Sequence, residues 1–370
     1  MRVAAPGKQL ISGEWSVLEY GNPAIVASIN RYVYCDIEEN NCIELNFPDF
    51  NFSVKAEFKN GDLVLERELN EEEKKISSFV LNAAKLALKY LDECGIELKG
   101  FKIKTDSKEA YAKAGEKKIG FGSSAAVTVA TCAAILAFHG INIEDYKNKV
   151  LIYKLSALAH YLAQGKIGSA FDIAASTFGN ILAYKRFNAD KILQEFQNTN
   201  LKSLVEEKNW EPLMLEPLNL PEGMIVKVIY SGYSASTKEL VLKMREFKKE
   251  NSEQYYQVMN SIAEVTNALI EAFKKEDKSK IMELIKKNRE LLKQLSDASG
   301  LNLETKELKE ICDTAEQLGF AAKFSGAGGG DCAIAITFNS ENEKLLEEKM
   351  KEKNYEILNV KISPHGVKVI

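Results

Sequence analysis

The stretch that decides the fold reads Lys117-Lys118-Ile119-Gly120-Phe121-Gly122-Ser123-Ser124-Ala125-Ala126. Two glycines two residues apart let the backbone bend tightly, and the serines stand where a helix begins. Residues 127–138 are apolar nearly all round, which predicts a buried helix whose N-terminus is fixed. Because unpaired N–H groups and the positive end of the helix dipole meet there, the turn suits a polyphosphate flanked by Lys117 and Lys118. An ordinary loop and helix cap explains the stretch equally well when it is taken alone.

Length and composition predict a two-domain globular protein. The chain has 370 residues, more than one hydrophobic core usually serves, with 45% hydrophobic and 28% charged residues. Its formal net charge of -4 argues against a general nucleic-acid binder. No apolar run is long enough to cross a bilayer, and residues 1–6 lack the apolar core of a signal peptide. We therefore expect a cytoplasmic protein without a nucleic-acid or membrane partner.

Cysteine usage points to reduced thiols. The six cysteines are scattered without C-x-x-C spacing, and the chain has only three histidines. This pattern predicts thiols that mostly pack in the core, and it argues against a structural zinc site.

The N-terminal segment is expected to be mostly β-structure. A short strand from Val3 is interrupted at Pro6-Gly7, and residues 9–18 resume an extended conformation. Strands follow over residues 24–37 and within 41–67, where the sequence Asn60-Gly61-Asp62 predicts a hairpin turn. Lys8 comes directly after the break, where it could point at a phosphate or could be a solvated lysine at a turn.

A helix over residues 71–94, ended by Gly95, is followed by a strand over 100–106. The period of two along that strand places Lys102 and Lys104 on one face. Two lysines there could line a binding cleft, or they could form the solvated face of the strand.

A second informative stretch, Gly165-Lys166-Ile167-Gly168-Ser169-Ala170-Phe171-Asp172, ends a helical run over 143–164. A new helix is expected to open at Ile173. Asp172 could be the N-cap of that helix. An aspartate on a constrained loop could also orient a nucleophile or a metal-bound water.

Residues 187–222, rich in charge, asparagine and proline, are expected to form a peripheral excursion that leads to the domain junction. A strand over 224–230 then precedes Ser231-Gly232-Tyr233-Ser234-Ala235-Ser236-Thr237-Lys238 at another helix start. Hydroxyls and a lysine there favour an anion, although helix capping explains the serines equally well. Helices with solvated, alternately charged faces are predicted over most of 239–318.

A third informative stretch reads Lys323-Phe324-Ser325-Gly326-Ala327-Gly328-Gly329-Gly330-Asp331-Cys332. Four glycines in five residues are costly in chain entropy and serve no evident packing purpose, so close approach of the backbone to a ligand is the preferred explanation. A strand over 333–338, a helix over 341–353 and strands near 355–362 and 366–370 are expected to follow.

The three glycine-rich stretches converge on phosphate chemistry. Neither the sequence G-x-x-x-x-G-K-[ST] of a P-loop nor the HRD and DFG motifs of a protein kinase occur.

Taken together, three ordered motifs resemble the GHMP kinase family. They are Pro6-Gly7-Lys8 with Gly13-Glu14, Gly120-Phe121-Gly122-Ser123-Ser124-Ala125-Ala126, and Ser325-Gly326-Ala327-Gly328-Gly329-Gly330-Asp331. The resemblance implies an α+β fold of two domains with the active site between them. Residues 1–220 would form an N-terminal domain like ribosomal protein S5 domain 2, and residues 221–370 a ferredoxin-like C-terminal domain.

Within the family, four stretches are most similar to the branch that phosphorylates mevalonate 5-phosphate. They are residues 13–19, residues 163–172, Ala235-Ser236-Thr237-Lys238 and Gly329-Gly330-Asp331-Cys332. The resemblance thus implies transfer of the ATP γ-phosphoryl group to (R)-5-phosphomevalonate, giving 5-diphosphomevalonate and ADP on the mevalonate route to isoprenoids. The alternatives are kinases of mevalonate or mevalonate 3-phosphate, a decarboxylase of the superfamily, and a non-catalytic metabolite sensor.

The resemblance also implies roles for individual residues. Lys8 and Asp172 would be catalytic. ATP would bind at Lys118, Gly120, Gly122, Ser123, Ser124 and Ala125, and Mg²⁺ would contact Ser123 or Ser124. The acceptor would bind at Lys102, Lys104, Lys166, Ser169, Ser236, Lys238, Ser325, Gly326, Gly328 and Gly329. The expected partners are small molecules, with a monomer and a homodimer both left open.

The chain departs from the family pattern at two positions. Phe121 stands where the second motif usually has leucine, while both glycines are retained. His160 lies near the position where mevalonate kinases carry a glutamate that binds magnesium.

Overall fold

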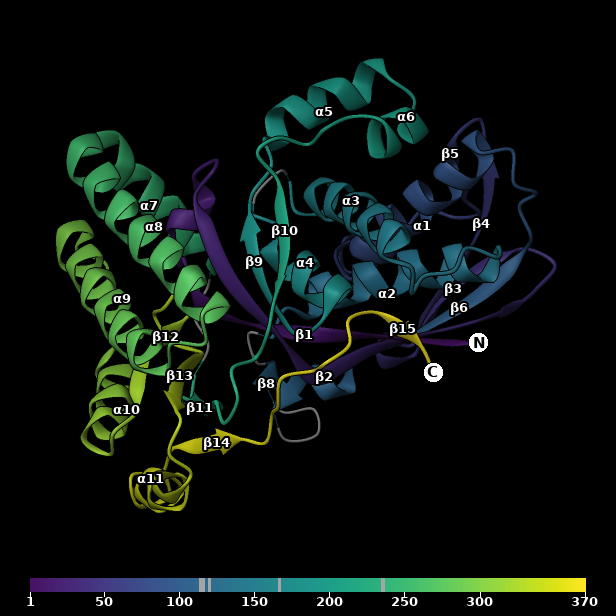
Figure 1. Ribbon diagram of the computed structural model, residues 1–370. Coiled ribbons are helices and arrows are strands. Elements are labelled where there is room, and N and C mark those ends of the chain that lie inside the picture. Colours follow the sequence, from purple (N-terminus) through teal and green to yellow (C-terminus); the bar gives the residue numbers. More distant parts are fainter. Residues whose placement is uncertain (113–116, 119–120, 166–167, 234–236) are drawn as a thin grey trace.

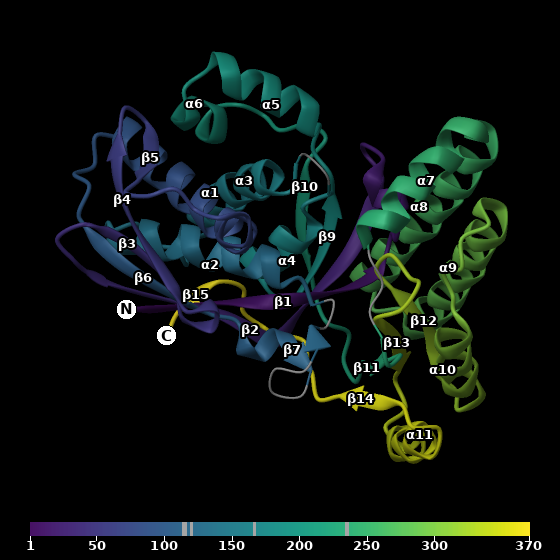
Figure 2. The ribbon, with the colours of Figure 1, turned by 180° about the vertical axis from the view of Figure 1, so that it is seen from behind.

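The computed structural model describes residues 1–112, 117–118, 121–165, 168–233 and 237–370, with the backbone alone at 110–112, 117–118 and 238. Two sheets lie next to each other, each covered by its own helices (Figure 1). The two chain ends meet beside the first sheet, where Ile370 N–H donates to Arg2 O at 2.9 Å (Figures 1 and 2). None of the helices in the described part of the chain is long and apolar enough to cross a membrane.

The first sheet has the strand order β10-β9-β2-β6-β3-β4-β5, and β1 pairs with both β2 and β15. Every pairing is antiparallel except that of β3 with β6. The strands are β1 (Arg2–Ser12), β2 (Pro23–Glu39), β3 (Ile43–Phe47), β4 (Phe52–Lys59), β5 (Asp62–Leu65), β6 (Phe101–Asp106), β9 (Ile181–Lys185), β10 (Met214–Leu218) and β15 (Lys368–Val369). A separate small pair joins β7 (Tyr111–Ala112) to β8 (Lys117–Lys118).

Helices cover one face of this sheet, where the largest hydrophobic core lies (Figure 1). They are α1 (Glu71–Glu93), α2 (Ser123–Phe138), α3 (Tyr146–Ala163) and α4 (Phe171–Phe178), with α5 (Ala189–Asn198) and α6 (Leu201–Glu206) above them. The start of α1 is fixed by a capping box between Asn70 and Glu73. Helix α2 is apolar on all sides because it is packed between α1, α3 and the sheet.

The second sheet is antiparallel, in the order β12-β13-β11-β14. Its strands are β11 (Ile225–Tyr230), β12 (Ala321–Ser325), β13 (Cys332–Thr337) and β14 (Glu356–Leu358). The helices of this half are α7 (Thr237–Glu250), α8 (Ser252–Lys274), α9 (Lys278–Ser299), α10 (Lys306–Gln317) and α11 (Glu341–Glu352). Together these elements confirm the expected two-part α+β architecture, with helices filling most of 239–318.

A separate core cluster joins the two halves. It packs Ile25 and Phe121, on the face of the first sheet away from α1–α4, against Ile270 of α8 and Ile334 of β13. The first sheet is therefore covered on both faces around β1, β2 and β9. The expected boundary at residue 220 falls between β10 and β11 and stays a prediction, since β15 crosses it to pair with β1.

Several local expectations are confirmed. Asn60 and Gly61 have φ of 53° and 76°, as a tight hairpin between β4 and β5 requires. Gly95, with φ of 71°, follows α1. The expected interruption at Pro6-Gly7 is wrong, because β1 runs without a break from Arg2 to Ser12 and has only a shift in register there.

Two further local expectations are met only in part. Residues 9–18 do not stay extended, because Ser16–Leu18 forms a 3₁₀ turn, η1, after β1 ends at Ser12. Residues 187–222 are more regular than expected, since two helices begin at the N-caps Asn188 and Asn200. Two further 3₁₀ turns are η2 (Pro48–Phe50) and η3 (Lys108–Ala110).

A fully buried ion pair links the segment after β1 to the second sheet. Lys323 Nζ contacts Glu14 Oε1 and donates to Phe324 O at 2.9 Å. Burial raises the pKa of the Glu14 carboxyl and lowers the pKa of the Lys323 ammonium, and their mutual attraction opposes both shifts. Such a pair stabilises weakly as a whole, but either charge left alone is costly.

We therefore expect Lys323→Met to lower the free energy of unfolding by about 3–5 kcal/mol, because Glu14 would remain buried without its partner. The double variant Glu14→Leu/Lys323→Met should regain most of that loss. Urea denaturation measures both values, with Lys349→Met in the exposed Lys349–Glu352 pair as a control of little effect. Equal losses in the single and double variants would contradict this account.

Candidate active site

A cavity of about 620 Å³ lies where the two halves of the molecule meet. Its walls come from β1, η1, the N-terminus of α2, the end of α3, the start of α4, the first turns of α7 and the loop after β12. The glycine-rich second and third motifs and the segment 168–172 thus border one space, although they are far apart in the sequence.

The N-terminus of α2 opens into this cavity through Gly122, Ser123 and Ser124. Gly122 is the N-cap in a left-handed conformation, with φ of 76° and ψ of 39°, and no side chain of the described residues caps the helix there. The first turn therefore presents its N–H groups and the positive end of the dipole to a ligand. This geometry suits a phosphate group.

Lys8 and Asp172 both lie close to Gly122. A Cβ at Gly122 would lie 3.0 Å from Lys8 Cγ and 3.7 Å from Asp172 Cβ. Lys8 is held from the backbone side, since its N–H donates to Phe121 O at 2.9 Å, and its Nζ lies 5.8 Å from the centre of the Phe171 ring. One cation and one carboxylate thus lie near the helix N-terminus.

Asp172 stands in the first turn of α4 and is not its N-cap. The N-cap is Ala170, in a left-handed conformation with φ of 59°. Asp172 Oδ1 accepts the N–H of Ile173 at 3.0 Å, and the carboxylate lines the cavity. Of the two expectations for Asp172, the capping role is therefore wrong.

His160, which the family resemblance puts near the position of a glutamate, contacts Ser124. Its Nε2 lies 3.2 Å from Ser124 Oγ, and the residue is only 4% exposed. Burial lowers the pKa of the imidazole, while the nearby Asp172 carboxylate acts in the opposite direction. The imidazole is therefore neutral at neutral pH.

The polar groups around α2 fit a magnesium ion held mainly by phosphates. The described residues contain no cluster of three acidic, histidine or cysteine side chains that could hold a metal. Mg²⁺ in phosphoryl transfer needs only one or two protein oxygens besides phosphates and water. Ser124 Oγ keeps a free lone pair whichever way its hydrogen bond to His160 runs, and Ser123 and Asp172 border the same space.

The loop after β12 contributes to the cavity through Ser325, Gly326 and Ala327. Ser325 Oγ donates to Leu10 O at 2.7 Å and accepts the N–H of Leu10 at 3.2 Å, which fixes the start of this loop to β1. Gly326 has φ of 90° and open space around its Cβ position. Gly326 therefore has room for a ligand at its side.

The remaining glycines of the loop have a packing purpose, contrary to expectation. A Cβ at Gly328 would lie 2.5 Å from Leu303 O, and Gly329 N–H donates to that same oxygen at 2.7 Å. A Cβ at Gly330 would lie 3.0 Å from the Tyr233 ring. Gly328 and Gly329 do not line the cavity, so they hold the loop against its neighbours.

Two lysines expected at the acceptor site are elsewhere. Lys102 and Lys104 are not among the lining residues of the cavity, and Lys102 Nζ pairs with Glu44 Oε1 at 3.0 Å. Lys104 pairs with Asp36 of β2, and Lys8 pairs with Ser28 of the same strand. At the usual rise per residue of a strand, Asp36 and Ser28 are about 26 Å apart. The alternative of a solvated strand face describes the two lysines.

Other candidates are divided between the cavity and parts that the structure does not describe. Ser169 lines the cavity. Ala125 does not line it and is buried in α2, directly after the lining residue Ser124. Gly120, Lys166 and Ser236 lie outside the described residues, as do the side chains of Lys118 and Lys238.

Sequence reasoning gave no role to two lining residues with unsatisfied polar atoms. Trp15, 4% exposed, has φ of 62°, and its Nε1 finds no hydrogen-bond partner among the described residues. Asp331 Oδ1 is buried and equally without a described partner. In the sequence, only the position of Trp15 and Asp331 within stretches that resemble the family pointed to the site.

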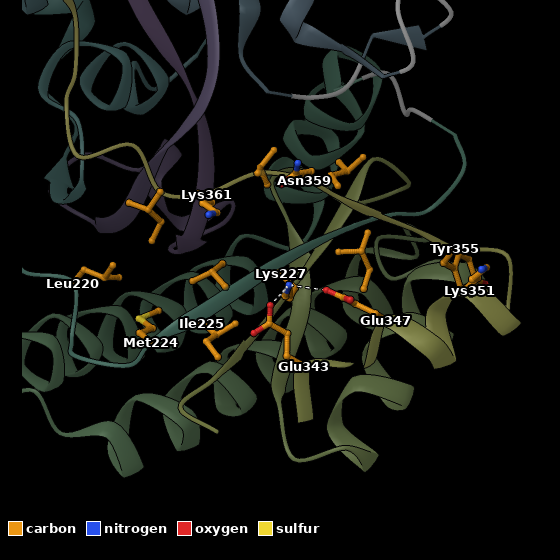
Figure 3. A pocket seen from close by; sticks show the side chains of 15 residues that line it. Leu220, Met224, Ile225, Lys227, Glu343, Glu347, Lys351, Tyr355, Asn359 and Lys361 are labelled. Carbon is orange, nitrogen blue, oxygen red and sulfur yellow. Dashed lines mark hydrogen bonds and ion pairs between the residues drawn. The ribbon is translucent and has the colours of Figure 1, made fainter. Parts of the chain in front are cut away.

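A second, slightly larger cavity of about 670 Å³ lies between β11, β14 and α11 (Figure 3). Figure 3 shows Lys227 with dashed lines to Glu343 and Glu347, and the Glu347 contact measures 3.0 Å. Lys227 is thus neutralised, and no glycine is among the described residues that line this cavity. Lys351 and Lys361 line it as well, together with Glu343 and Glu347.

Comparisons with known proteins match both halves of the chain to one family. Residues 78–180 match the model of the GHMP kinases N terminal domain, and residues 269–356 match GHMP kinases C terminal. The phosphomevalonate kinase of Streptomyces sp. (strain CL190) is 27% identical, over 97% of this chain and 96% of that protein. The mevalonate kinase of Methanocaldococcus jannaschii is 30% identical, over 98% and 99%.

Solved structures show the same fold. A Lin0012 protein from Listeria innocua aligns with a TM-score of 0.89 at 31% identity, covering 100% of this chain and 99% of that one. Phosphomevalonate kinase from Streptococcus pneumoniae, in complex with phosphomevalonate and AMPPNP, aligns with a TM-score of 0.81 at 24% identity, covering 98% and 99%.

Gly122→Ala should weaken binding of AMPPNP by tenfold or more, because the new Cβ meets Lys8 Cγ at 3.0 Å. Gly140→Ala is a matched control. Gly140 follows α2 with φ of 90° and has nothing within 4 Å of its Cβ position, so it carries the backbone strain without the clash. Calorimetric titration gives the affinities, and equal affinity in both variants would remove Lys8 and Gly122 from the phosphate site.

Proposed function

Because the chain belongs to the GHMP kinase family, we propose that it transfers the γ-phosphoryl group of ATP to (R)-5-phosphomevalonate. The products would be 5-diphosphomevalonate and ADP. The observation that carries this proposal is that Lys8 and Asp172 both lie close to Gly122, at the N-terminus of α2, and line the same cavity. Likeness to kinases of the mevalonate pathway over nearly the whole chain supports it.

The main chemical task at such a site is to bring two anions together. A phosphate monoester has a second pKa near 6, so the attacking oxygen of the acceptor is already largely ionised at neutral pH. A strong general base is therefore less necessary than for an alcohol. Fixed positive charge is needed instead, because the reaction depends on positioning and electrostatic stabilisation.

Lys8 is the described cation best placed to supply that charge. Its backbone N–H donates to Phe121 O, and its side chain packs beside Gly122 at the N-terminus of α2. We assign Lys8 the role of bridging the γ-phosphoryl group and the acceptor oxygen. The N–H groups at Ser123 and Ser124 would bind the other phosphate oxygens.

Asp172 would orient the acceptor or take up a residual proton. Asp172 lies in the first turn of α4, close to Gly122, and lines the cavity. Ser123 or Ser124 would contact Mg²⁺, which supplies charge neutralisation at the phosphates when bound. His160 would hold the Ser124 hydroxyl through its hydrogen bond.

The acceptor would occupy the half of the cavity bordered by Ser169, Thr237, Ser325 and Gly326. Gly168 and Thr237 line the cavity. In the sequence, Lys166 comes two residues before Gly168, and Lys238 directly follows Thr237. These two lysines are our candidates for binding the phosphate and carboxylate of the acceptor.

Mevalonate itself is the second candidate acceptor. The 30% identical mevalonate kinase covers almost the whole chain, so the family relationship does not separate the two acceptors. Both reactions would share Lys8, Asp172 and the α2 turn, and they differ in the charge that the acceptor half must bind.

Purified protein with Mg-ATP should release ADP with mevalonate 5-phosphate and yield a diphosphate, with little release with mevalonate. Coupled ADP detection gives the rates, and mass spectrometry identifies the products. Release with mevalonate alone would replace the acceptor in this proposal. Release with neither would favour the sensor alternative.

Lys8→Met should reduce turnover by about two to three orders of magnitude, as loss of one transition-state donor does elsewhere, with little change in the midpoint of thermal unfolding. Lys104→Met is the matched control, because Lys104 lies on an exposed strand face away from the cavity, and it should keep wild-type turnover. Near-normal activity of Lys8→Met would remove Lys8 from the reaction.

Asp172→Asn should keep measurable turnover, since an ionised acceptor needs no strong base. The same assay measures it. Complete loss, with binding of AMPPNP retained, would show that the carboxylate takes part as an obligatory base.

A further inference from the structure

The loop that precedes Asp172 is held in a conformation that its own residues do not favour. Gly168 has φ of 125°, and Ala170 has φ of 59°, a left-handed conformation that residues with a Cβ rarely adopt. Asp172 follows two residues later, in the first turn of α4. Contacts from outside the loop must therefore maintain its shape.

Two buried tyrosines supply such contacts. Tyr161 OH donates to Gly168 O at 2.5 Å, and Tyr184 OH donates to Ser169 O at 2.5 Å. Tyr184 OH also lies 2.9 Å from Tyr153 OH. Burial raises the pKa of Tyr161 to about 12, so the phenol keeps the proton that it donates.

Arg186 extends this network to the other side of the cavity. Its Nε donates to Tyr161 OH at 3.1 Å, and its Nη1 donates to Leu18 O at 2.6 Å. The guanidinium also lies over the Tyr20 ring, 4.8 Å from its centre. Leu18, with Trp15 and Val17, lines the cavity from the segment that follows β1.

The contacts form a continuous chain from Leu18 O through Arg186 and Tyr161 to Gly168 O. We propose that Arg186 is a positioning residue that couples the segment 15–18, which lines the cavity, to the loop that orients Asp172. The inference rests on the proposed function, because it assigns Asp172 a place in phosphoryl transfer. A shift of Leu18 on acceptor binding would be transmitted to Asp172 through rigid, planar groups.

The chemistry of Arg186 explains why arginine suits this position. A guanidinium donates in two fixed directions at once, whereas an ammonium on a flexible stem is a single point charge. Arg186→Lys should therefore keep the charge and lose the bridge. Tyr161→Phe should keep the ring and lose the donor to Gly168.

In the phosphotransfer assay, both Arg186→Lys and Tyr161→Phe should lower kcat about tenfold or more and leave the affinity for AMPPNP within twofold of wild type. The double variant should lose no more than the worse single variant, because each breaks the same chain of contacts. Arg31→Lys is the matched control. Its guanidinium also donates to a backbone carbonyl, that of Asn359 at 3.0 Å, outside the candidate site, and kcat should not change.

A readout independent of activity separates this inference from the proposed function. Hydrogen–deuterium exchange of the amides of residues 168–174, in protein without ligand, should rise at least threefold in both Arg186→Lys and Tyr161→Phe, and not in Arg31→Lys. Unchanged exchange there, or additive losses of kcat in the double variant, would overturn the coupling. A wild-type protein inactive toward mevalonate 5-phosphate would overturn the proposed acceptor, while the exchange data would still decide whether Arg186 holds the loop.

Discussion

The structure depends on one strand, β1, being fixed to both halves of the molecule. Its first residues pair with β2 and β15 in the first sheet. Its last residues reach the second half, where Leu10 bonds Ser325 and Ser12 Oγ lies 2.8 Å from Thr266 Oγ1. The buried contact between Glu14 and Lys323 follows directly. Lys8 lies between these two anchored ends, so the geometry of the cavity is set by the docking of one half on the other.

Local patterns in the sequence were sufficient for most elements and for the phosphate-binding turn. A glycine before two serines and an apolar run predicted a tight turn into a buried helix, and Gly122 is the N-cap of α2, with φ of 76°. The helices α5 and α6 were not predicted, because the charged and proline-rich composition of this segment is typical of a loop. The N-caps Asn188 and Asn200 are the local signals for them. The turn at Ser16–Leu18 was missed because its apolar residues also suit a strand.

Other expectations failed because they depended on neighbours distant in the sequence. The glycine run at 326–330 requires close approach, as expected, but at Gly328 the approaching group is Leu303 O and not a ligand. Lys102 and Lys104 share a face, as their spacing predicts, but sheet order places that face beside Glu44. Chain entropy predicts that a group approaches the glycine run, and strand periodicity predicts that the two lysines share a face. Neither identifies the neighbouring group.

The neutral side chain at position 160 bears on which acceptor the site suits. A glutamate beside Ser124 would add a negative charge next to the polyphosphate, and an acceptor with its own phosphate would add about two more. His160 is buried, and desolvation keeps the imidazole uncharged while it still hydrogen-bonds Ser124. The site thereby loses a protein carboxylate without losing the contact that holds the serine. In the proposed function, this exchange would favour the more highly charged acceptor, because like charges in a partly buried site raise the free energy of bringing both reactants together.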